Sequence, residues 1–431
     1  MSPEILGLLG IVVLVILILA RMWIGLAMAL VGFLGVVFIL GPEGAFSAVA
    51  TIPFLKVAYY PISTIPLFLL MGTIIGNSGI GAELYDTASK SVGQFRGGLA
   101  IATILSGAGF AAVTGDAMAG IAIFGKVALP EMRRLGYDDQ LATGSIASAS
   151  TLAFLIPPSI AFIIYGIITE TPISLLFMAG ILPGILLSII YMITTRIITA
   201  RRPGAGPAGP KTNLREKIAS LKHVWHVLIL FLLVLGGIWG GIFTPTEAGA
   251  IGAFGAIVIT AASRRLTSRI LFDSLKETAQ VTGMIFLLIV GSFIFIRFLA
   301  LSKLPFVLSD FLVQLPWPPM AIFAAIILFY VILGMFLEIF SAVILTVPIL
   351  LPAILAMGFD PIWFGVIVVL VISVGLVTPP VGVAVYMLSG ITGVPAFTVF
   401  RGVVPYIIAA IICIIILAIF PQIALFIPRM M

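Results

Sequence analysis

The chain alternates long apolar runs with short polar stretches, a pattern typical of a protein that crosses a membrane many times. A helix needs about 17 to 25 mostly apolar residues to span the hydrocarbon layer. Ten runs have this character, although the first is slightly short. They are residues 5–20, 24–40, 61–80, 142–168, 173–193, 224–243, 248–262, 281–300, 364–388 and 403–423. The pattern predicts an all-α polytopic membrane protein.

Two further apolar stretches, residues 97–129 and 319–351, are too long for one span, and small or polar residues interrupt each of them. These residues are Ser106, Gly107, Thr114, Gly115 and Asp116 in the first stretch, and Gly334, Glu338 and Ser341 in the second. Each arm covers only about half to two-thirds of a bilayer, at a rise of about 1.5 Å per residue. A re-entrant helical hairpin is the simplest interpretation, and one long kinked helix is the alternative.

The second half of the chain repeats the first at a fixed offset of 222 residues. Eight residues are identical at that offset: Leu129 and Leu351, Pro130 and Pro352, Gly136 and Gly358, Asp138 and Asp360, Pro157 and Pro379, Pro158 and Pro380, Gly180 and Gly402, Pro183 and Pro405. Two consecutive prolines remove backbone donors and clash with the preceding turn. We therefore expect the runs 142–168 and 364–388 to be helices broken at their proline pairs.

The basic residues favour the hairpin interpretation. The chain is 62% hydrophobic and 9% charged, with a formal charge of +6, so the excess of Lys and Arg should lie in cytoplasmic loops. With hairpins, 18 of the 22 basic residues fall on one face, which places the N-terminus outside. The four exceptions are Lys56, Arg297, Lys303 and Arg429. Each half then has an odd number of crossings, which makes the second repeat inverted.

This topology divides the chain into three parts. Residues 1–200 form the first inverted repeat, residues 201–222 a cytoplasmic linker rich in Pro, Gly and basic residues, and residues 223–431 the second inverted repeat. Residues 83–95 and 269–280 are moderately polar, and we expect both to be amphipathic helices along the inner interface.

Inverted repeats with interrupted helices predict a secondary transporter whose site lies near the membrane midplane. Carbonyl oxygens freed at the breaks can bind Na⁺, and the N-terminal ends of half-helices attract an anion. The candidate ion- and substrate-binding residues belong to the two hairpin tips and the two breaks. They are Ser106, Gly107, Thr114, Gly115, Asp116, Pro157, Pro158, Ser159, Glu338, Ser341, Thr378, Pro379 and Pro380.

Asp116 and Glu338 are equivalent at the 222-residue offset. An ionisable group inside a membrane suggests a function, here ion coupling or gating, and capping of a half-helix is the structural alternative. The spacing of polar residues fits no hydrolytic enzyme, and no Gly-rich loop followed by Lys suggests ATP binding. We therefore expect a carrier driven by an ion gradient.

An ordered set of motifs resembles the large membrane subunit of the tripartite ATP-independent periplasmic (TRAP) transporters, within the broader ion-transporter superfamily. The motifs are PLFLLMG at residues 66–72, LIPPS at 155–159, IIYG at 163–166, TE at 169–170, AGILPG at 179–184, TPTEA at 244–248 and TPPVG at 378–382. The resemblance runs nearly from end to end.

The resemblance implies an elevator-type carrier in the cytoplasmic (inner) membrane of a bacterium or archaeon, coupled to Na⁺. It implies an organic-anion substrate, such as a dicarboxylate, sialic acid or sugar acid, that a periplasmic substrate-binding protein delivers. It also implies a small four-span membrane subunit, and no role for nucleic acid.

By position in the family, Na⁺ is expected at Ser106, Ser341, Thr378 and nearby backbone carbonyls. One ion would lie between Ser106 with the first tip and the second break, and the other between Ser341 and the first break. Asp116 stands where many members have a small Ser, and residues 368–374 offer only Ser373 where many have Asn.

Two other readings stay open at this stage. One is a self-sufficient symporter of an anion and Na⁺ from the same superfamily, and the other is an ion channel or membrane scaffold that keeps the fold. For a TRAP carrier, coupling to H⁺ through Asp116 and Glu338 also stays open.

Overall fold

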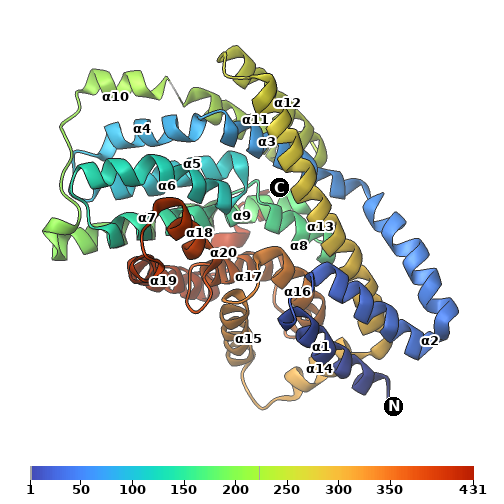
Figure 1. Ribbon diagram of the computed structural model, residues 1–431. Coiled ribbons are helices and arrows are strands. Elements are labelled where there is room, and N and C mark those ends of the chain that lie inside the picture. Colours follow the sequence, from blue (N-terminus) through green and yellow to red (C-terminus); the bar gives the residue numbers. More distant parts are fainter. Residues whose placement is uncertain (1, 223) are drawn as a thin grey trace.

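The computed structural model describes residues 2–222 and 224–431 as a bundle of helices, with no strand among them (Figure 1). The all-α prediction is confirmed. Within the described residues, seven helices are long and apolar enough to cross a membrane. The predicted start of the second repeat, His223, lies outside the described residues.

The helices of the first half end where the sequence places Gly, Pro or polar residues. They are α1 (Pro3–Leu19), α2 (Ile24–Val57), α3 (Thr64–Asn77), α4 (Ile80–Val92), α5 (Gly98–Thr114), α6 (Ala117–Arg134), α7 (Asp139–Thr151), α8 (Ile160–Thr169) and α9 (Ile173–Arg201), with short 3₁₀ turns η1 (Tyr60–Ser63), η2 (Leu152–Phe154) and η3 (Pro203–Ala205).

The second half follows the same order after a short connecting helix. Its helices are α10 (Leu214–Leu221), α11 (Trp225–Trp239), α12 (Pro245–Ala262), α13 (Ser268–Ser302), α14 (Leu304–Gln314), α15 (Pro319–Gly334), α16 (Ile339–Ala356), α17 (Pro361–Gly375), α18 (Val383–Thr392), α19 (Ala396–Ile419) and α20 (Gln422–Leu425), followed by the 3₁₀ turn η4 (Pro428–Met430). The bounds of α16 lie 222 residues after those of α6 at both ends. The inverted orientation of the halves in a membrane stays a prediction.

α2 and α13 form the long axis of one side of the molecule, which also carries α1 and α12 (Figure 1). Glycines bring their backbones together, because a Cβ added at Gly291 would lie 2.0 Å from the carbonyl oxygen of Gly25. Small residues at such contacts are typical of helices that pack within a membrane. We call this group of helices, with α3 and α11, the scaffold.

Residues 269–280, expected to be amphipathic and to lie along the inner interface, do not form an element of their own. These residues begin α13, which continues without interruption through the predicted span to Ser302. The chain has no Pro in this stretch to break the helix, and its polar side chains have partners on α3. Thr73 lies 3.1 Å from the hydroxyl of Thr278, and the Asn77 amide donates to Ser274 at 3.1 Å.

The other predicted amphipathic segment is confirmed as a helix, α4. The predicted linker is more structured than expected, since α10 packs against α4. Lys217 donates to the carbonyl oxygen of Ser91 at 3.2 Å, and Thr212 donates to that of Lys90 at 2.6 Å. These contacts hold residues 212–221 against α4, so this part of the linker is not a free tether.

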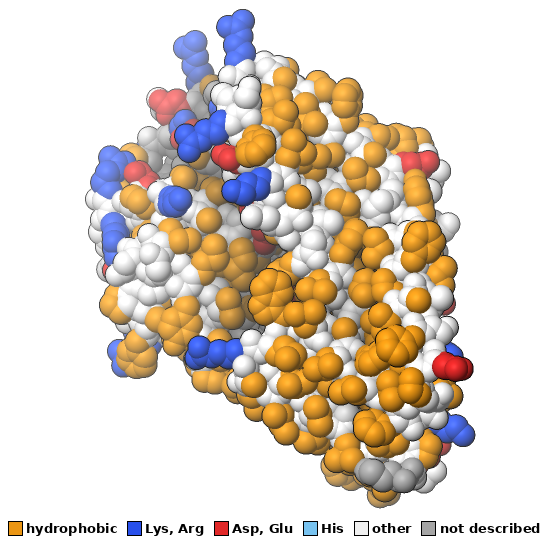
Figure 2. All heavy atoms as spheres, turned by 45° about the vertical axis from the view of Figure 1, so that its right-hand side comes forward, with side chains coloured by type: hydrophobic (Ala, Val, Ile, Leu, Met, Phe, Trp, Pro, Cys, Tyr) orange, Lys and Arg blue, Asp and Glu red, His pale blue; other side chains and the backbone are white. Residues whose placement is uncertain are grey.

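Hydrophobic side chains cover most of the scaffold face in Figure 2, while most of the Lys and Arg side chains visible there gather toward the top and left. Phe38, Phe46 and Phe54 of α2 are each at least 65% exposed. Apolar exposure on this scale fits a surface that faces lipid or another membrane protein.

α7 and α17 form the centre of the fold, because residues 141–151 and 363–375 are buried on every side. A helix that is buried all round belongs to the core of a large protein. α7 packs tightly on α19, since a Cβ added at Gly144 would lie 2.2 Å from the carbonyl oxygen of Gly402. The first half of each predicted broken helix therefore runs through the core and stops there at the break.

Candidate functional site

The first hairpin consists of α5 and α6, and its tip is a tight turn at Gly115 and Asp116. Gly115 adopts φ +61°, a conformation that suits glycine, and ends α5. The Asp116 carboxylate accepts a hydrogen bond from the backbone N–H of Met118 at 2.8 Å and caps α6. The Thr114 hydroxyl is buried and donates to the carbonyl oxygen of Phe110 at 2.9 Å.

The first break, residues 155–159, separates α7 with its 3₁₀ extension from α8. The peptide bond between Pro157 and Pro158 is cis. The Ser159 hydroxyl donates to the carbonyl oxygen of Phe154 at 2.6 Å and accepts from the N–H of Phe162 at 3.4 Å. Ser159 therefore ties the end of one half-helix to the start of the next.

The tip of the first hairpin lies directly against the first break. A Cβ added at Gly115 would lie 2.4 Å from the carbonyl oxygen of Pro158. On the other side of the tip, a Cβ at Gly72 of α3 would lie 2.6 Å from the carbonyl oxygen of Thr114. Non-helical backbone from two segments thus meets at one place, where a membrane protein can hold an ion.

The second hairpin, α15 and α16, has a wider turn at residues 335–338. Glu338 accepts from the N–H of Phe340 at 3.1 Å and caps α16, as Asp116 caps α6. The Ser341 hydroxyl donates to the Glu338 carboxylate at 3.3 Å. Gly334 packs against α17, since a Cβ there would lie 3.0 Å from the carbonyl oxygen of Ile372.

The second break, residues 376–382, also contains a cis peptide bond, between Pro379 and Pro380. The Thr378 hydroxyl donates to the carbonyl oxygen of Val374 at 2.7 Å. Gly382, with φ +54°, starts α18. The two breaks differ in exposure: the first proline pair is buried, whereas the second is exposed.

Each hairpin also contacts the opposite half, because α6 packs on α18 and α16 packs on α8. The structure therefore brings the two tips and the two breaks into one central region, built from half-helix ends.

Comparison with known proteins decides the family to which this arrangement belongs. The model of the family described as tripartite ATP-independent periplasmic transporter, DctM component, matches residues 11–423. The chain is a member of this family of large TRAP membrane subunits. It is 34% identical over 372 residues to the C4-dicarboxylate TRAP transporter large permease protein DctM of Pseudomonas aeruginosa, with 86% of this chain and 87% of the relative covered.

Further similarities agree with this assignment. The chain is 32% identical over 372 residues to the sialic acid TRAP transporter large permease protein SiaM of Vibrio cholerae, covering 86% and 87% of the two chains. Its fold is similar to that of the YdaH transporter of Alcanivorax borkumensis, with a TM-score of 0.66, 15% identity, and 89% and 90% of the chains covered. The TRAP large subunit is thus a multi-pass membrane transporter and not an enzyme.

One predicted site residue of this TRAP subunit lies elsewhere. Ser106 is not at the hairpin tip, but inside α5, eight residues before Thr114 and so about 12 Å along the helix. Its hydroxyl donates to the carbonyl oxygen of Ala102 at 2.7 Å. The neighbouring Gly107 does not interrupt the helix but lets α5 approach Ala149 of α7, where an added Cβ would lie 2.9 Å from the alanine methyl.

The sequence did not point to a small polar cavity that borders Asp116. The cavity has a volume of about 130 Å³ and lies between the first hairpin, α3 and α13. Its lining includes Thr73, Asn77 and Glu277, and the Asn77 amide donates to the Glu277 carboxylate at 3.4 Å. A polar Asn77 within the apolar run 61–80 could have indicated a polar site there. Its partner Glu277 lies on α13, 200 residues later in the chain, and sequence spacing does not predict that contact.

The base of the first hairpin is fixed by an ion pair outside the predicted membrane spans. The Arg133 guanidinium donates two hydrogen bonds of 2.8 Å to the Asp139 carboxylate at the start of α7. These bonds hold the pKa of the Asp139 carboxyl below its usual range. Since α7 is the central core helix, this pair attaches the hairpin to the core.

Proposed function

We propose that this chain imports an organic anion across the cytoplasmic membrane of a bacterium or archaeon, in symport with Na⁺ and by an elevator movement. The observation that carries the proposal is the central region of two hairpin tips and two breaks in a TRAP large subunit. Relatives named for C4-dicarboxylate and for sialic acid support a carboxylated substrate.

The substrate carboxylate is proposed to bind at the start of α18. Among the described residues, no side chain caps the first turn of α18, whereas α6, α8 and α16 are capped by Asp116, Ser159 and Glu338. The helix dipole gives such an N-terminus a partial positive charge that attracts an anion. The N–H groups of Ala384 and Val385 already donate to the carbonyl oxygens of Leu376 and Gly382, at 3.2 and 2.8 Å, so the dipole supplies the attraction. The proline pair before α18 is exposed, so an anion can reach this end of the helix.

Na⁺ is proposed to bind where each tip meets the break of its own half. In the first half, the carbonyl oxygens near Gly115 and Pro158 support an ion there, because unwound backbone supplies oxygen ligands. In the second half, Ser341 follows the tip and Thr378 lies in the break, and their hydroxyls are the proposed ligands. Ser106 lies too far along α5 to join the first site.

The hairpins and broken helices are proposed to move together against the scaffold. A periplasmic substrate-binding protein would deliver the anion, and a small four-span membrane subunit would cover part of the apolar scaffold face. The word tripartite in the family description, and the name large permease in the relatives, support two further components.

Uptake by proteoliposomes tests this function. The chain would be reconstituted with the small subunit, and uptake of labelled succinate or sialic acid measured with and without the cognate binding protein. We expect uptake only with an inward Na⁺ gradient and the binding protein. Uptake without the binding protein would indicate a self-sufficient symporter, and passive current without saturable uptake would indicate a channel.

A further inference from the structure

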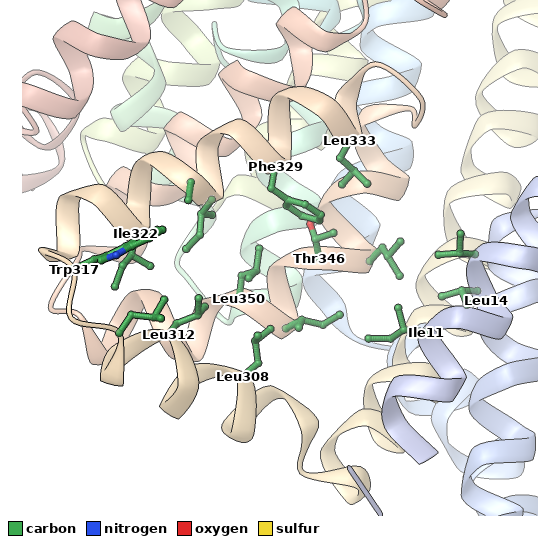
Figure 3. A pocket seen from close by; sticks show the side chains of 16 residues that line it. Ile11, Leu14, Leu308, Leu312, Trp317, Ile322, Phe329, Leu333, Thr346 and Leu350 are labelled. Carbon is green, nitrogen blue, oxygen red and sulfur yellow. The ribbon is translucent and has the colours of Figure 1, made fainter. Parts of the chain in front are cut away.

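An apolar crevice of about 510 Å³ lies between α1, α14 and the second hairpin (Figure 3). Ile11, Leu14, Leu308, Phe329 and Leu350 are among the side chains that line it. Thr346 is the one polar side chain among the described lining residues, and its hydroxyl already donates to the carbonyl oxygen of Ala342 at 2.6 Å. The crevice therefore offers almost nothing to which water could hydrogen-bond.

Both arms of the second hairpin pack on α17, where Gly334 and Gly375 lie in close contact, and α16 also packs on α14. The hydroxyls of Thr346 in α16 and Tyr330 in α15 form a hydrogen bond of 3.0 Å that joins the arms. The apolar gap therefore lies beside the hairpin, where α1 and α14 face it.

The crevice has an exposed rim and a buried floor. Val15 and Phe329 on the rim are each 45% exposed, whereas Leu14 and Ile322 on the floor are at most 3% exposed. A cavity of about 150 Å³ lined by Leu, Ile and Phe stays dry and binds benzene in another protein. The present crevice has room for more than three times that volume, in an elongated space that α1, α14, α15 and α16 share.

We propose that one acyl chain of a bilayer phospholipid occupies this crevice. Trp317, which also lines it, lies in the loop between α14 and α15 and is 56% exposed. Trp is enriched at the level of the lipid headgroups, so Trp317 places one end of the crevice near that level. A phospholipid anchored there by its headgroup can lay a chain across the floor and remove apolar surface from the gap.

The acyl chain would contact the scaffold at α1, and it would contact the second hairpin at α15 and α16. These elements belong to the two parts that the proposed elevator movement separates. The acyl chain therefore fills a gap at the boundary where one part slides past the other.

The test uses the full chain in liposomes that contain a phosphatidylethanolamine with a photoactivatable diazirine in its acyl chain. After irradiation and digestion, peptide mass spectrometry locates the adducts. We expect adducts on floor residues such as Leu14, Ile322 and Leu350, in addition to rim residues that face bulk lipid. An Ala325→Trp variant fills the crevice, because Ala325 lines it, and should reduce floor adducts at least fivefold.

Ala324→Trp is the matched control, since Ala324 is also exposed on α15 but does not line the crevice. It should leave floor adducts unchanged. The proposal fails if rim residues carry adducts and floor residues carry none. It also fails if the Ala325→Trp and Ala324→Trp variants carry equal amounts of adduct on floor residues. It also fails if a diazirine fatty acid labels the floor and the phospholipid does not. Labelling of rim and floor residues in the wild-type protein is itself a test, so the proposal can be refuted even if a variant does not fold.

Discussion

At the scale of single residues, the site rests on a pair of carboxylates that the sequence already related. Asp116 and Glu338 are equivalent at the 222-residue offset, and each accepts an amide hydrogen bond at the start of the second arm of its hairpin. A carboxylate at that position compensates the helix dipole. Capping of α6 and α16 accounts for a carboxylate at this position in both halves. A role of these carboxylates in ion coupling would be a second function.

Thr378→Ala should weaken Na⁺ activation. The Thr378 hydroxyl lies at the second break, and its loss would remove one proposed oxygen ligand of the ion. Losing one such interaction costs about 1.4 kcal/mol, which corresponds to a roughly tenfold higher Na⁺ concentration for half-maximal uptake. The measurement is the initial uptake rate as a function of Na⁺ concentration.

Ser106→Ala is a chemically matched control. Both hydroxyls donate to the carbonyl oxygen four residues earlier at 2.7 Å, but only Thr378 lies at a break. We expect less than a twofold change in Na⁺ activation for Ser106→Ala. Equal shifts in the two variants would remove Thr378 from the proposed ion site.

The same two residues show what the sequence could and could not predict at this scale. Ser106 and Thr378 were selected from the sequence because they are polar residues within apolar runs, and their role stays a prediction. Their distance from the tip depends on where the helix ends, and Gly115 rather than Ser106-Gly107 ends α5, because Gly115 alone adopts positive φ there. Gly107 remains helical since it serves a close contact with α7.

At the scale of elements, the close contact between the first tip and the first break organises the site. It brings two pieces of non-helical backbone together, and Gly115 is the residue that permits it. Gly136, in the turn between α6 and α7, also has positive φ, at +78°, but a Cβ there would meet nothing within 4 Å.

Gly115→Ala and Gly136→Ala should therefore differ in function. Both variants pay the cost of alanine in a left-handed conformation, about 1 kcal/mol. Only Gly115→Ala also collides with Pro158, so it should displace the tip and lower the uptake rate at least tenfold. Gly136→Ala should retain most of the uptake, with a small loss of thermal stability. Equal uptake by the two variants, at equal amounts of folded protein, would contradict the role given to this contact.

Helix ends were predictable from the sequence wherever a proline pair or a glycine with positive φ marks them. The end of α5 at Gly115 and both breaks are examples. The continuity of α13 was not predictable from hydropathy, because its polar first turns are stabilised by α3, a helix about 200 residues away in the sequence. Long-range partners of this kind leave no local signal.

At the scale of the whole molecule, the two halves are related in sequence but differ in exposure. Ile164 in α8 is fully buried, whereas Tyr386, its equivalent in α18, is 54% exposed. The sequence predicts that α18 lies in the cytoplasmic half of the membrane and α8 in the outer half. With that topology, the exposed second break predicts access to the central region from the cytoplasm. Sequence repetition alone could not reveal which half is open, because that depends on the state of the carrier.

The most direct test of this account measures access to the two equivalent positions from each side of the membrane. Ile164→Cys and Tyr386→Cys variants would be treated with an impermeant maleimide in right-side-out and inside-out vesicles, with the buried Cys413 as the only native thiol. We predict that the Tyr386→Cys variant reacts from the cytoplasmic face, at least tenfold faster than the Ile164→Cys variant from that face. Equal reactivity of the two variants, or reaction of the Tyr386→Cys variant only from the outer face, would contradict a single central site reached through inverted halves.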